Sequence, residues 1–404
     1  MKLTIVTALG LSLLAGSAVA QTLRVAVLND MSGPFADLSG KGSVIAAQMA
    51  AEDYAAGAGP NAVRVEILFG DHQNKADVGA ALARKWVDQD HVAAVVDVPN
   101  SAVALAVNQV MREKDRVFLA SSSASSDLTG DQCSPTTVQW TFDTWALANG
   151  TARALVQNGG DSWFFLTADY AFGHVLQRDA SALVTKAGGR VVGEAAHPLN
   201  TMDFSNYLLR AQSSGAKVIA LANAGTDTSN AIKQAAEFGI GQDGKQQLAG
   251  LLVFLTDVDA LGLQTAQGLV LTEAFYWDLN DQTRAWSRRF AERDGGRMPT
   301  MNHAGVYSSV LAYLRAAQAV GVPAEAAPSG AKVVALMETA PIADPLFGTV
   351  TIRKDGRAVH PMYLFQVKKP SESKGRWDYY NLVATIPTEQ AFRPMADGGC
   401  KLVN

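Results

Sequence analysis

Few side chains in this sequence are suited to bind a metal ion. Among its 404 residues are two cysteines and six histidines. The histidines are scattered, with no pair at the spacing typical of metal ligands, and neither cysteine has a second cysteine or a histidine near it. The sequence therefore predicts no metal site, and nothing in it indicates a cofactor.

Long apolar runs and a strong excess of one charge are also missing. After the N-terminal segment no apolar run reaches the roughly 18 residues of a membrane span, which predicts a soluble mature chain. The 34 basic and 38 acidic residues give a formal net charge of −4. Such a mildly acidic chain is not expected to have nucleic acid as its main partner.

Residues 1–20 have the pattern of a secretory signal peptide. A lysine at the start is followed by an apolar stretch, Leu3 to Leu14, and by a small-residue cleavage site, Ala18-Val19-Ala20. No cysteine follows the cleavage site, so no lipid anchor is expected. The pattern predicts export to the periplasm, which is oxidising, and there Cys133 and Cys400 are expected to form a disulfide.

Predicted strands and helices alternate along most of the chain. The alternation pauses in the aromatic-rich segment 132–149 and resumes with a second run of similar build. This order is typical of parallel sheets with helices on both faces, and it predicts an α/β fold of two doubly wound lobes. Near the C-terminus a hairpin is expected from strands at 347–354 and 360–368, turning at Asp355-Gly356. The first predicted strands are 23–28, 63–69, 92–98 and 117–120.

Small hydroxyl residues follow two successive predicted strands. Ser101 begins the helix after the strand 92–98, and the run Ser121 to Ser126 follows the strand 117–120. The carboxyl ends of parallel strands are where ligands of open α/β sheets bind, and helix starts there present free N–H groups. The pattern favours a carboxylate site, but the same serines would also serve simply as helix caps.

Several short motifs, taken in order, resemble one protein family. Residues 25–34 (Val-Ala-Val-Leu, then Met-Ser-Gly-Pro) resemble its opening strand and turn, and Asn100-Ser101 with the segment 119–129 resembles its ligand-binding strand ends. Tyr170-Ala171-Phe172-Gly173 and Asp203-Phe204-Ser205 resemble two further motifs. The family is that of the periplasmic solute-binding proteins of ABC transporters, branched-chain amino acid (Leu/Ile/Val-binding) class. The resemblance covers nearly the whole mature chain.

The resemblance implies the type I periplasmic-binding fold, in which two lobes joined by a multi-strand hinge close on a ligand. Lobe 1 would comprise residues 21–143 and about 274–345, and lobe 2 residues 144–273 and about 346–404. It also implies a monomer that carries a small carboxylate ligand to an ABC transporter permease in the inner membrane, with no catalytic residues.

The resemblance further implies a set of ligand-binding residues. The ligand carboxylate would meet the Ser101 hydroxyl and backbone N–H groups near Ser122 and Ala124, although the family usually has threonine where Ala124 stands. Leu38 and Pro99 would form an apolar wall. The full set is Leu38, Pro99, Asn100, Ser101, Ser122, Ser123, Ala124, Trp145, Tyr170, Phe172, Ala224 and Asp257.

Departures from the family pattern affect which ligand is expected. Amino-acid binders of this family hold the ligand's ammonium with a tyrosine of lobe 2 and a glutamate from a later strand end. Here Phe172 takes the place of that tyrosine, and the later stretches read Ala222-Asn223-Ala224-Gly225-Thr226 and Phe254-Leu255-Thr256-Asp257. Unless Asp257 replaces the glutamate, the ammonium would be buried without a partner, which is costly.

We therefore expect an aromatic acid, similar to benzoate or a hydroxycinnamate, with Trp145 and Phe172 stacking on its ring. A hydrophobic or branched-chain amino acid is the alternative for the same clamp, with Asp257 as the ammonium partner. A periplasmic hydrolase with a nucleophile in the run Ser121 to Ser126 is an alternative of another class, although no Gly-x-Ser-x-Gly pattern occurs in the sequence.

Overall fold

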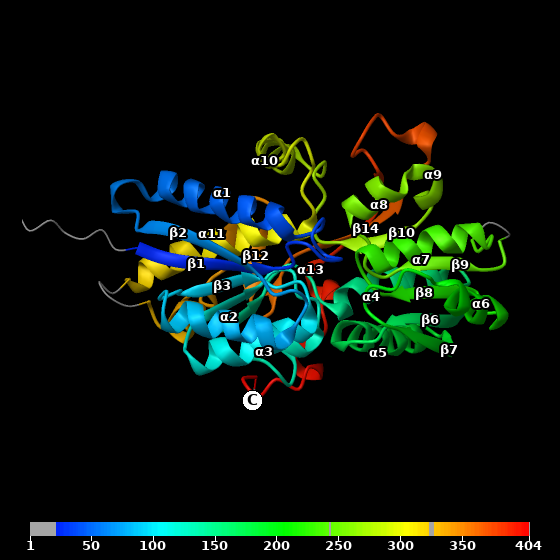
Figure 1. The fold of residues 1–404 in the computed structure, drawn as a ribbon, viewed down its shortest axis with the longest axis horizontal. Coiled ribbons are helices and arrows are strands. Elements are labelled where there is room, and N and C mark those ends of the chain that lie inside the picture. Colours follow the sequence, from blue (N-terminus) through cyan, green and yellow to red (C-terminus); the bar gives the residue numbers. More distant parts are fainter. Residues whose placement is uncertain (1–21, 242–243, 323–326, 404) are drawn as a thin grey trace, which may run out of the picture.

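The computed structural model describes residues 22–241, 244–322 and 327–403, so the predicted signal peptide lies outside the described residues. Two lobes lie side by side along the longest axis of the molecule (Figure 1). Each has a central parallel sheet covered by helices, which confirms the predicted α/β fold with two doubly wound lobes. Within these described ranges, no helix is both long enough and apolar enough to cross a membrane.

The first lobe is built on a five-stranded parallel sheet in the order β2-β1-β3-β4-β5. In β1, Val25 and Val27 pack with α1 and α11, while Ala26 and Leu28 pack with α2 and α3. Successive side chains of a strand point to opposite faces, so this apolar strand is buried on both sides. The strands are β1 (Thr22–Asn29), β2 (Arg64–Asp71), β3 (Ala94–Asp97), β4 (Val117–Ala120) and β5 (Thr137–Gln139). The helices are α1 (Gly40–Ala58), η1 (Gly59–Asn61), α2 (Ala76–Asp88), α3 (Ser101–Glu113), η2 (Ser126–Thr129), α10 (Asp281–Arg293), α11 (Met301–Val320) and α12 (Gly330–Met337).

The second lobe repeats this plan with a four-stranded parallel sheet in the order β7-β6-β8-β9. Trp163 and Phe165 of β6 pack with α4 and α5, and Phe164 and Leu166 pack with α6 and α7. The strands are β6 (Ser162–Ala168), β7 (Arg190–His197), β8 (Val218–Ala222) and β9 (Gln247–Gly250). The helices are α4 (Thr144–Gln157), α5 (Ala171–Lys186), α6 (Ser205–Ser213), α7 (Thr226–Glu237), α8 (Leu255–Leu261) and α9 (Leu263–Ala266).

The C-terminal part of the chain forms two small antiparallel sheets, which correct the predicted hairpin. The turn at Asp355-Gly356 does join two antiparallel strands, but β12 pairs with the short β13, whereas β14 pairs with β10 and β15. Pro361, which has no N–H to donate, separates β13 from β14. The elements are β10 (Val270–Glu273), β11 (Ile342–Asp344), β12 (Gly348–Ile352), β13 (Ala358–Val359), β14 (Met362–Val367), η3 (Pro370–Glu372), β15 (Tyr380–Ile386), α13 (Thr388–Ala391) and η4 (Met395–Asp397).

Two links fasten the C-terminal segments to the rest of the chain. A disulfide joins Cys133 to Cys400. The fully buried Arg357 donates hydrogen bonds to the carbonyl oxygens of Trp140 (2.9 Å) and Phe142 (2.8 Å), in the segment that leads from β5 into α4. Both links join parts of the chain that are far apart in the sequence, with a separation of 267 residues in the case of the disulfide.

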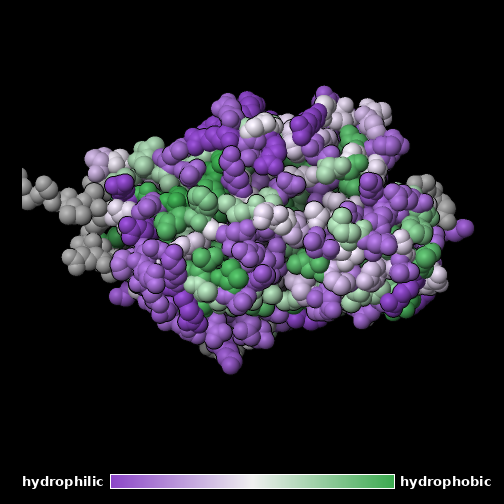
Figure 2. Space-filling view, viewed as in Figure 1, coloured by the Kyte–Doolittle hydropathy of each residue, from purple (hydrophilic) through white to green (hydrophobic). Residues whose placement is uncertain are grey.

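The surface seen in Figure 2 is mostly hydrophilic, with hydrophobic residues in small separate groups. This distribution is usual for the outside of a folded protein, whose exposed apolar residues occur singly or in small patches.

Candidate ligand-binding site

A small cavity of about 10 Å³ lies between the two lobes. Four of its lining side chains are aromatic, and among the described residues that line it none is charged. The first lobe and α11 contribute Phe35, Leu38, Pro99, Ser122, Ala124 and Asn302, and the second lobe contributes Tyr170, Phe172, Ala224, Leu252 and Phe254.

Strand ends and helix starts position these side chains. Pro99 follows β3, Ser122 and Ala124 follow β4, and Ala224 follows β8. Phe172 lies in the first turn of α5. The carboxyl ends of both parallel sheets thus face the same cavity, which is the ligand position expected for open α/β sheets.

Seven of the predicted binding residues meet in this cavity: Leu38, Pro99, Ser122, Ala124, Tyr170, Phe172 and Ala224. The other five, Asn100, Ser101, Ser123, Trp145 and Asp257, are absent from its lining. Four lining residues were not predicted: Phe35, Leu252, Phe254 and Asn302. Phe254 belongs to the stretch Phe254-Leu255-Thr256-Asp257 that the sequence analysis considered, whereas no sequence motif included Asn302.

Within the serine run, the hydroxyls of Ser122 and Ser123 are engaged within the protein, whereas the buried Ser121 hydroxyl has no partner among the described residues. Ser122 donates its hydroxyl hydrogen bond to the carboxylate of Asp97, and Ser123 donates to the carbonyl oxygen of Val98. The N–H of Ala124, by contrast, donates no hydrogen bond within the described part of the chain. A free backbone donor therefore sits among the residues that line the cavity.

Asp97 lies behind Ser122 and was not singled out from the sequence. It is fully buried, and its carboxylate also accepts hydrogen bonds from Ser39 Oγ (2.7 Å) and Asn29 Nδ2 (3.0 Å). Burial raises the pKa of this carboxyl, and the hydrogen bonds oppose that rise. With φ of 85° its backbone is left-handed, a conformation that Asp adopts more readily than most residues.

Asn100, not Ser101, caps α3. The Asn100 side-chain oxygen accepts hydrogen bonds from the N–H groups of Ala102 (3.0 Å) and Val103 (3.3 Å). The Ser101 hydroxyl is buried and has no partner within the described residues. The structure does not bring Ser101 to the cavity, so it gives no contact through which this hydroxyl would hold a ligand.

Trp145 lies outside the cavity, which corrects the stacking position expected for it. Asp143 starts α4 by accepting a hydrogen bond from the N–H of Ala146 (2.7 Å), and the first turn of the helix carries Trp145 into a separate groove. That groove also contains Arg153 of α4, Lys186 of α5 and Phe392 near the C-terminus. The helix start thus turns this indole away from the ring-lined cavity.

Asp257 is also placed elsewhere. Its carboxylate accepts hydrogen bonds from the N–H of Phe254 (2.9 Å) and the hydroxyl of Ser229 (3.2 Å), and so caps α8. Burial raises the pKa of Asp257 to about 7. It lines a neighbouring groove between the lobes, together with Pro34 and Asp37, and its carboxylate is already used by the helix start.

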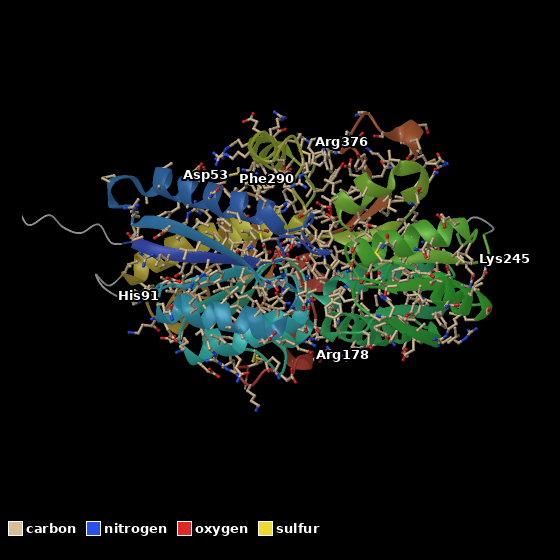
Figure 3. The ribbon with its side chains drawn as sticks, in the orientation of Figure 1. Asp53, His91, Arg178, Lys245, Phe290 and Arg376 are labelled. Carbon is tan, nitrogen blue, oxygen red and sulfur yellow. A yellow bond between two sulfur atoms is a disulfide. The ribbon has the colours of Figure 1, made fainter. Side chains whose placement is uncertain are left out.

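The two lobes touch beside the cavity. Gly225, at the start of α7, has φ of 61°, and a Cβ built on it would lie 2.4 Å from the carbonyl oxygen of Pro34. Arg178 of α5, labelled in Figure 3 where the lobes meet, forms an ion pair with Asp127 of η2 (3.0 Å). These contacts hold the lobes close together on either side of the cavity in this structure.

Tyr170 is the remaining polar side chain of the second lobe in the cavity. Burial and the charge of Asp227 raise the pKa of its hydroxyl, so it stays protonated. Its ring lies 5.9 Å from that of Phe172. Among the described residues no cluster of His, Cys, Asp and Glu could hold a metal ion.

A family model described as periplasmic binding protein matches residues 22–376. The Leu/Ile/Val-binding protein homolog 6 of Brucella abortus (strain 2308) is 28% identical over 413 residues, covering 99% of this chain and all of that protein. A periplasmic binding protein of Burkholderia mallei is 46% identical, with a TM-score of 0.90 over 95% of this chain and 100% of that one.

More distant structures share the fold. A solute-binding protein of an ABC transporter from R. palustris, in complex with benzoate, is 18% identical with a TM-score of 0.81, and the comparison covers 94% of this chain and 99% of that one. A leucine-, isoleucine-, valine-, threonine- and alanine-binding protein of Brucella ovis is 20% identical with a TM-score of 0.79, covering 93% and 98%. The same fold thus occurs with both kinds of ligand.

Proposed function

Because the chain belongs to the periplasmic binding protein family, among the solute-binding proteins of branched-chain amino acid ABC transporters, we propose that it binds an aromatic carboxylic acid. The ligand would enter while the lobes are further apart, would lie between the residues that line the cavity in this structure, and would be handed unchanged to a membrane permease. The proposed lobes are those expected from the sequence, residues 21–143 with about 274–345 and residues 144–273 with about 346–404. Their closure on the ligand would stabilise the bound form.

The main support for this proposal is the composition of the cavity lining. Phe35, Tyr170, Phe172 and Phe254 surround it with aromatic rings, and no described lining residue is charged. An amino acid would bring an ammonium group into this space, where it would be buried without an anionic partner. The one carboxylate that the sequence offered for this role, that of Asp257, lies in the neighbouring groove. An aromatic body without an amino group suits the lining better.

Backbone groups supply the most suitable partner for the ligand's carboxylate. The N–H of Ala124 is free within the described residues and belongs to a cavity-lining residue. Hydrogen bonds from neutral N–H groups to a carboxylate are stronger than those between neutral groups, and they add no further buried charge. Ser122 would take part only by turning its hydroxyl from Asp97.

Two other functions have weaker support. The relatives named as Leu/Ile/Val-binding favour a hydrophobic amino acid, which would need Asp257 to leave its helix cap. A hydrolase would need an activated serine. Within the described residues, no hydroxyl of the run Ser121 to Ser126 is hydrogen-bonded to a histidine, the usual partner of such a nucleophile.

Isothermal titration of the purified mature protein against two panels tests the proposal. One panel holds benzoate, hydroxybenzoates and cinnamates, and the other holds leucine, isoleucine, valine and phenylalanine. Binding of the acids alone is expected. Saturable binding of the amino acids, with no response to any aromatic acid, would contradict the proposal and favour the amino-acid alternative.

Two matched variants test whether the ligand lies in this cavity. Phe172→Ala removes a ring from the cavity and is expected to weaken binding about tenfold, because a buried aromatic contact loses both area and stacking. Trp145→Ala removes a ring from the separate groove and should leave the affinity unchanged. Equal losses for both variants would mean that the ligand does not lie in this cavity.

A further inference from the structure

Asn302 is a polar residue of the cavity whose side chain has no partner within the described residues. Asn302 is fully buried and lines the cavity, and neither its amide nitrogen nor its amide oxygen is hydrogen-bonded within the described residues. Most buried polar side-chain atoms in proteins are paired. An unpaired amide that faces a ligand cavity therefore points to a partner on the ligand.

The backbone around Asn302 is held in place from both sides. Thr300, the cap of α11, donates its hydroxyl hydrogen bond to the carbonyl oxygen of Leu38 (2.8 Å). The His303 ring nitrogen Nε2 lies 2.9 Å from the carbonyl oxygen of Ser39, and this ring stacks on Phe290, which is labelled in Figure 3. The first turn of α11 is thus fixed against the segment that carries cavity-lining Leu38.

One turn further along, α11 is packed closely against the segment between β5 and α4. A Cβ on Gly305 would lie 1.9 Å from the Thr141 hydroxyl, so glycine is needed for this approach. Residues three apart lie on the same side of a helix, so Asn302 and Gly305 share this side. Asn302, one turn earlier on this side, is among the residues that line the cavity.

The chemistry of an amide decides what partner it accepts. Asn offers one acceptor oxygen and an NH₂ donor with no net charge. A carboxylate would use only the donor and leave the oxygen unpaired, whereas a hydroxyl group can both accept from Nδ2 and donate to Oδ1. The carboxylate of the proposed ligand already has a suitable donor in the N–H of Ala124.

We infer that Asn302 is a specificity-determining residue that hydrogen-bonds a hydroxyl group on the ligand's ring, so the protein prefers hydroxylated aromatic acids to unsubstituted ones. This inference rests on the proposed function and deepens it. A ligand without the hydroxyl would leave the amide unpaired, and sites built around a hydroxyl discriminate against analogues that lack it. For a neutral amide we expect about tenfold tighter binding of the preferred hydroxybenzoate than of benzoate.

Titration of the wild-type protein and of Asn302→Leu with benzoate, 3-hydroxybenzoate and 4-hydroxybenzoate tests the inference. Leucine has a similar size and no polar atoms, so the variant is expected to bind the preferred hydroxybenzoate about tenfold more weakly, while benzoate binds as well as or better than before. Asn206→Leu is the matched control, because Asn206 is an exposed residue at the same position in the first turn of α6. It should change neither affinity.

The other outcomes separate the inference from the proposed function. Equal loss of benzoate and hydroxybenzoate binding in Asn302→Leu would overturn the inference and leave the aromatic-acid proposal standing, as would equal affinity of the wild-type protein for all three acids. Binding of none of the acids by the wild-type protein would overturn both. If thermal unfolding shows that Asn302→Leu is not folded, the same titrations of Asn302→Ala, together with the selectivity of the wild-type protein, test the inference instead.

Discussion

Asp257 provides a direct test of the interpretation that this carboxylate serves the fold and not the ligand. It is buried at the start of α8, where it accepts hydrogen bonds from the N–H of Phe254 and the hydroxyl of Ser229. An asparagine in its place can keep both contacts, accepting from the N–H and donating to the hydroxyl. Asp257→Asn therefore removes a titratable proton and leaves the helix cap.

Burial raises the pKa of Asp257 from 3.8 to about 7 in the folded protein. Between these values the folded state binds more protons than the unfolded state, so stability falls as the pH rises. The stability that the protonated Asp257 carboxyl contributes, relative to the ionised form, is complete below about pH 4 and is lost by about pH 7. The difference between the two pKa values corresponds to about 4 kcal/mol, an upper limit for a single buried group.

Urea unfolding of the wild-type protein and the variant at pH 5 and pH 8 measures this effect. Asp257→Asn is expected to be more stable than the wild-type protein at pH 8 by about 1 to 4 kcal/mol, with a smaller difference at pH 5. The affinity for aromatic acids should not change, because Asp257 does not line the cavity. The matched control is Asp37→Asn, since Asp37 lines the same groove but is mostly exposed.

Two results would refute this reasoning. Equal pH dependence of unfolding in the wild-type protein and Asp257→Asn would show that the carboxyl does not titrate in this range. A loss of ligand affinity in Asp257→Asn, with Asp37→Asn unaffected, would show that the carboxylate reaches the ligand and would favour the amino-acid alternative.

Three further perturbations follow from the structure. Asp97→Ala removes the acceptor of three buried donors and should lower the free energy of unfolding by about 3 kcal/mol or more in urea. Gly225→Ala places a methyl group against the carbonyl oxygen of Pro34 and should weaken ligand binding about tenfold in titrations, because closure of the lobes is hindered. Replacing Cys133 and Cys400 by serine should lower the free energy of unfolding by about 2 to 5 kcal/mol, measured by thermal and urea unfolding.

Matched variants control these experiments. Asp97→Asn keeps an acceptor in place and should be milder than Asp97→Ala. Gly262→Ala introduces a methyl group at a similar positive φ, 73°, but into open space, so equal effects of the two glycine variants on binding would point to backbone strain and not to lobe contact. Unchanged stability of the serine variant relative to the oxidised protein would contradict a structural role of the disulfide.

The two lobes and most of the cavity could be predicted because they depend on local pattern. Pro99, Ser122 and Ala224 each follow the end of an apolar strand by two residues, so they come to the edge of a parallel sheet wherever the sheet forms. The pairing of β14 with β10 and β15 could not be predicted in this way. This pairing depends on which distant strand lies beside β14, and the alternating apolar pattern of a strand does not indicate which strand it pairs with.

The errors in the site have local physical causes. Asn100 and Ser101 are neighbours that are both able to cap a helix, and only the backbone angles decide which does. Trp145 lies one residue after the start of α4, and a shift of one position turns a helical side chain by about a quarter turn. Asn302 could not be predicted from the sequence, since an asparagine early in a helix belongs to no distinctive pattern. It was identified because its side chain has no hydrogen-bond partner within the described residues.

Each lobe takes strands or helices from distant parts of the chain, and this has a consequence for how the protein folds. The face of β1 that holds Val25 and Val27 is covered by α11, and the second-lobe segment 144–273 lies between these two elements in the sequence. β14 and β15 reach back to β10 after the chain has returned from α11. Contacts of such high sequence separation slow folding, because long loops must close before they form. Neither lobe can finish its core as an N-terminal fragment during synthesis, so a chain cut short before α11 is expected to aggregate instead of yielding one working half.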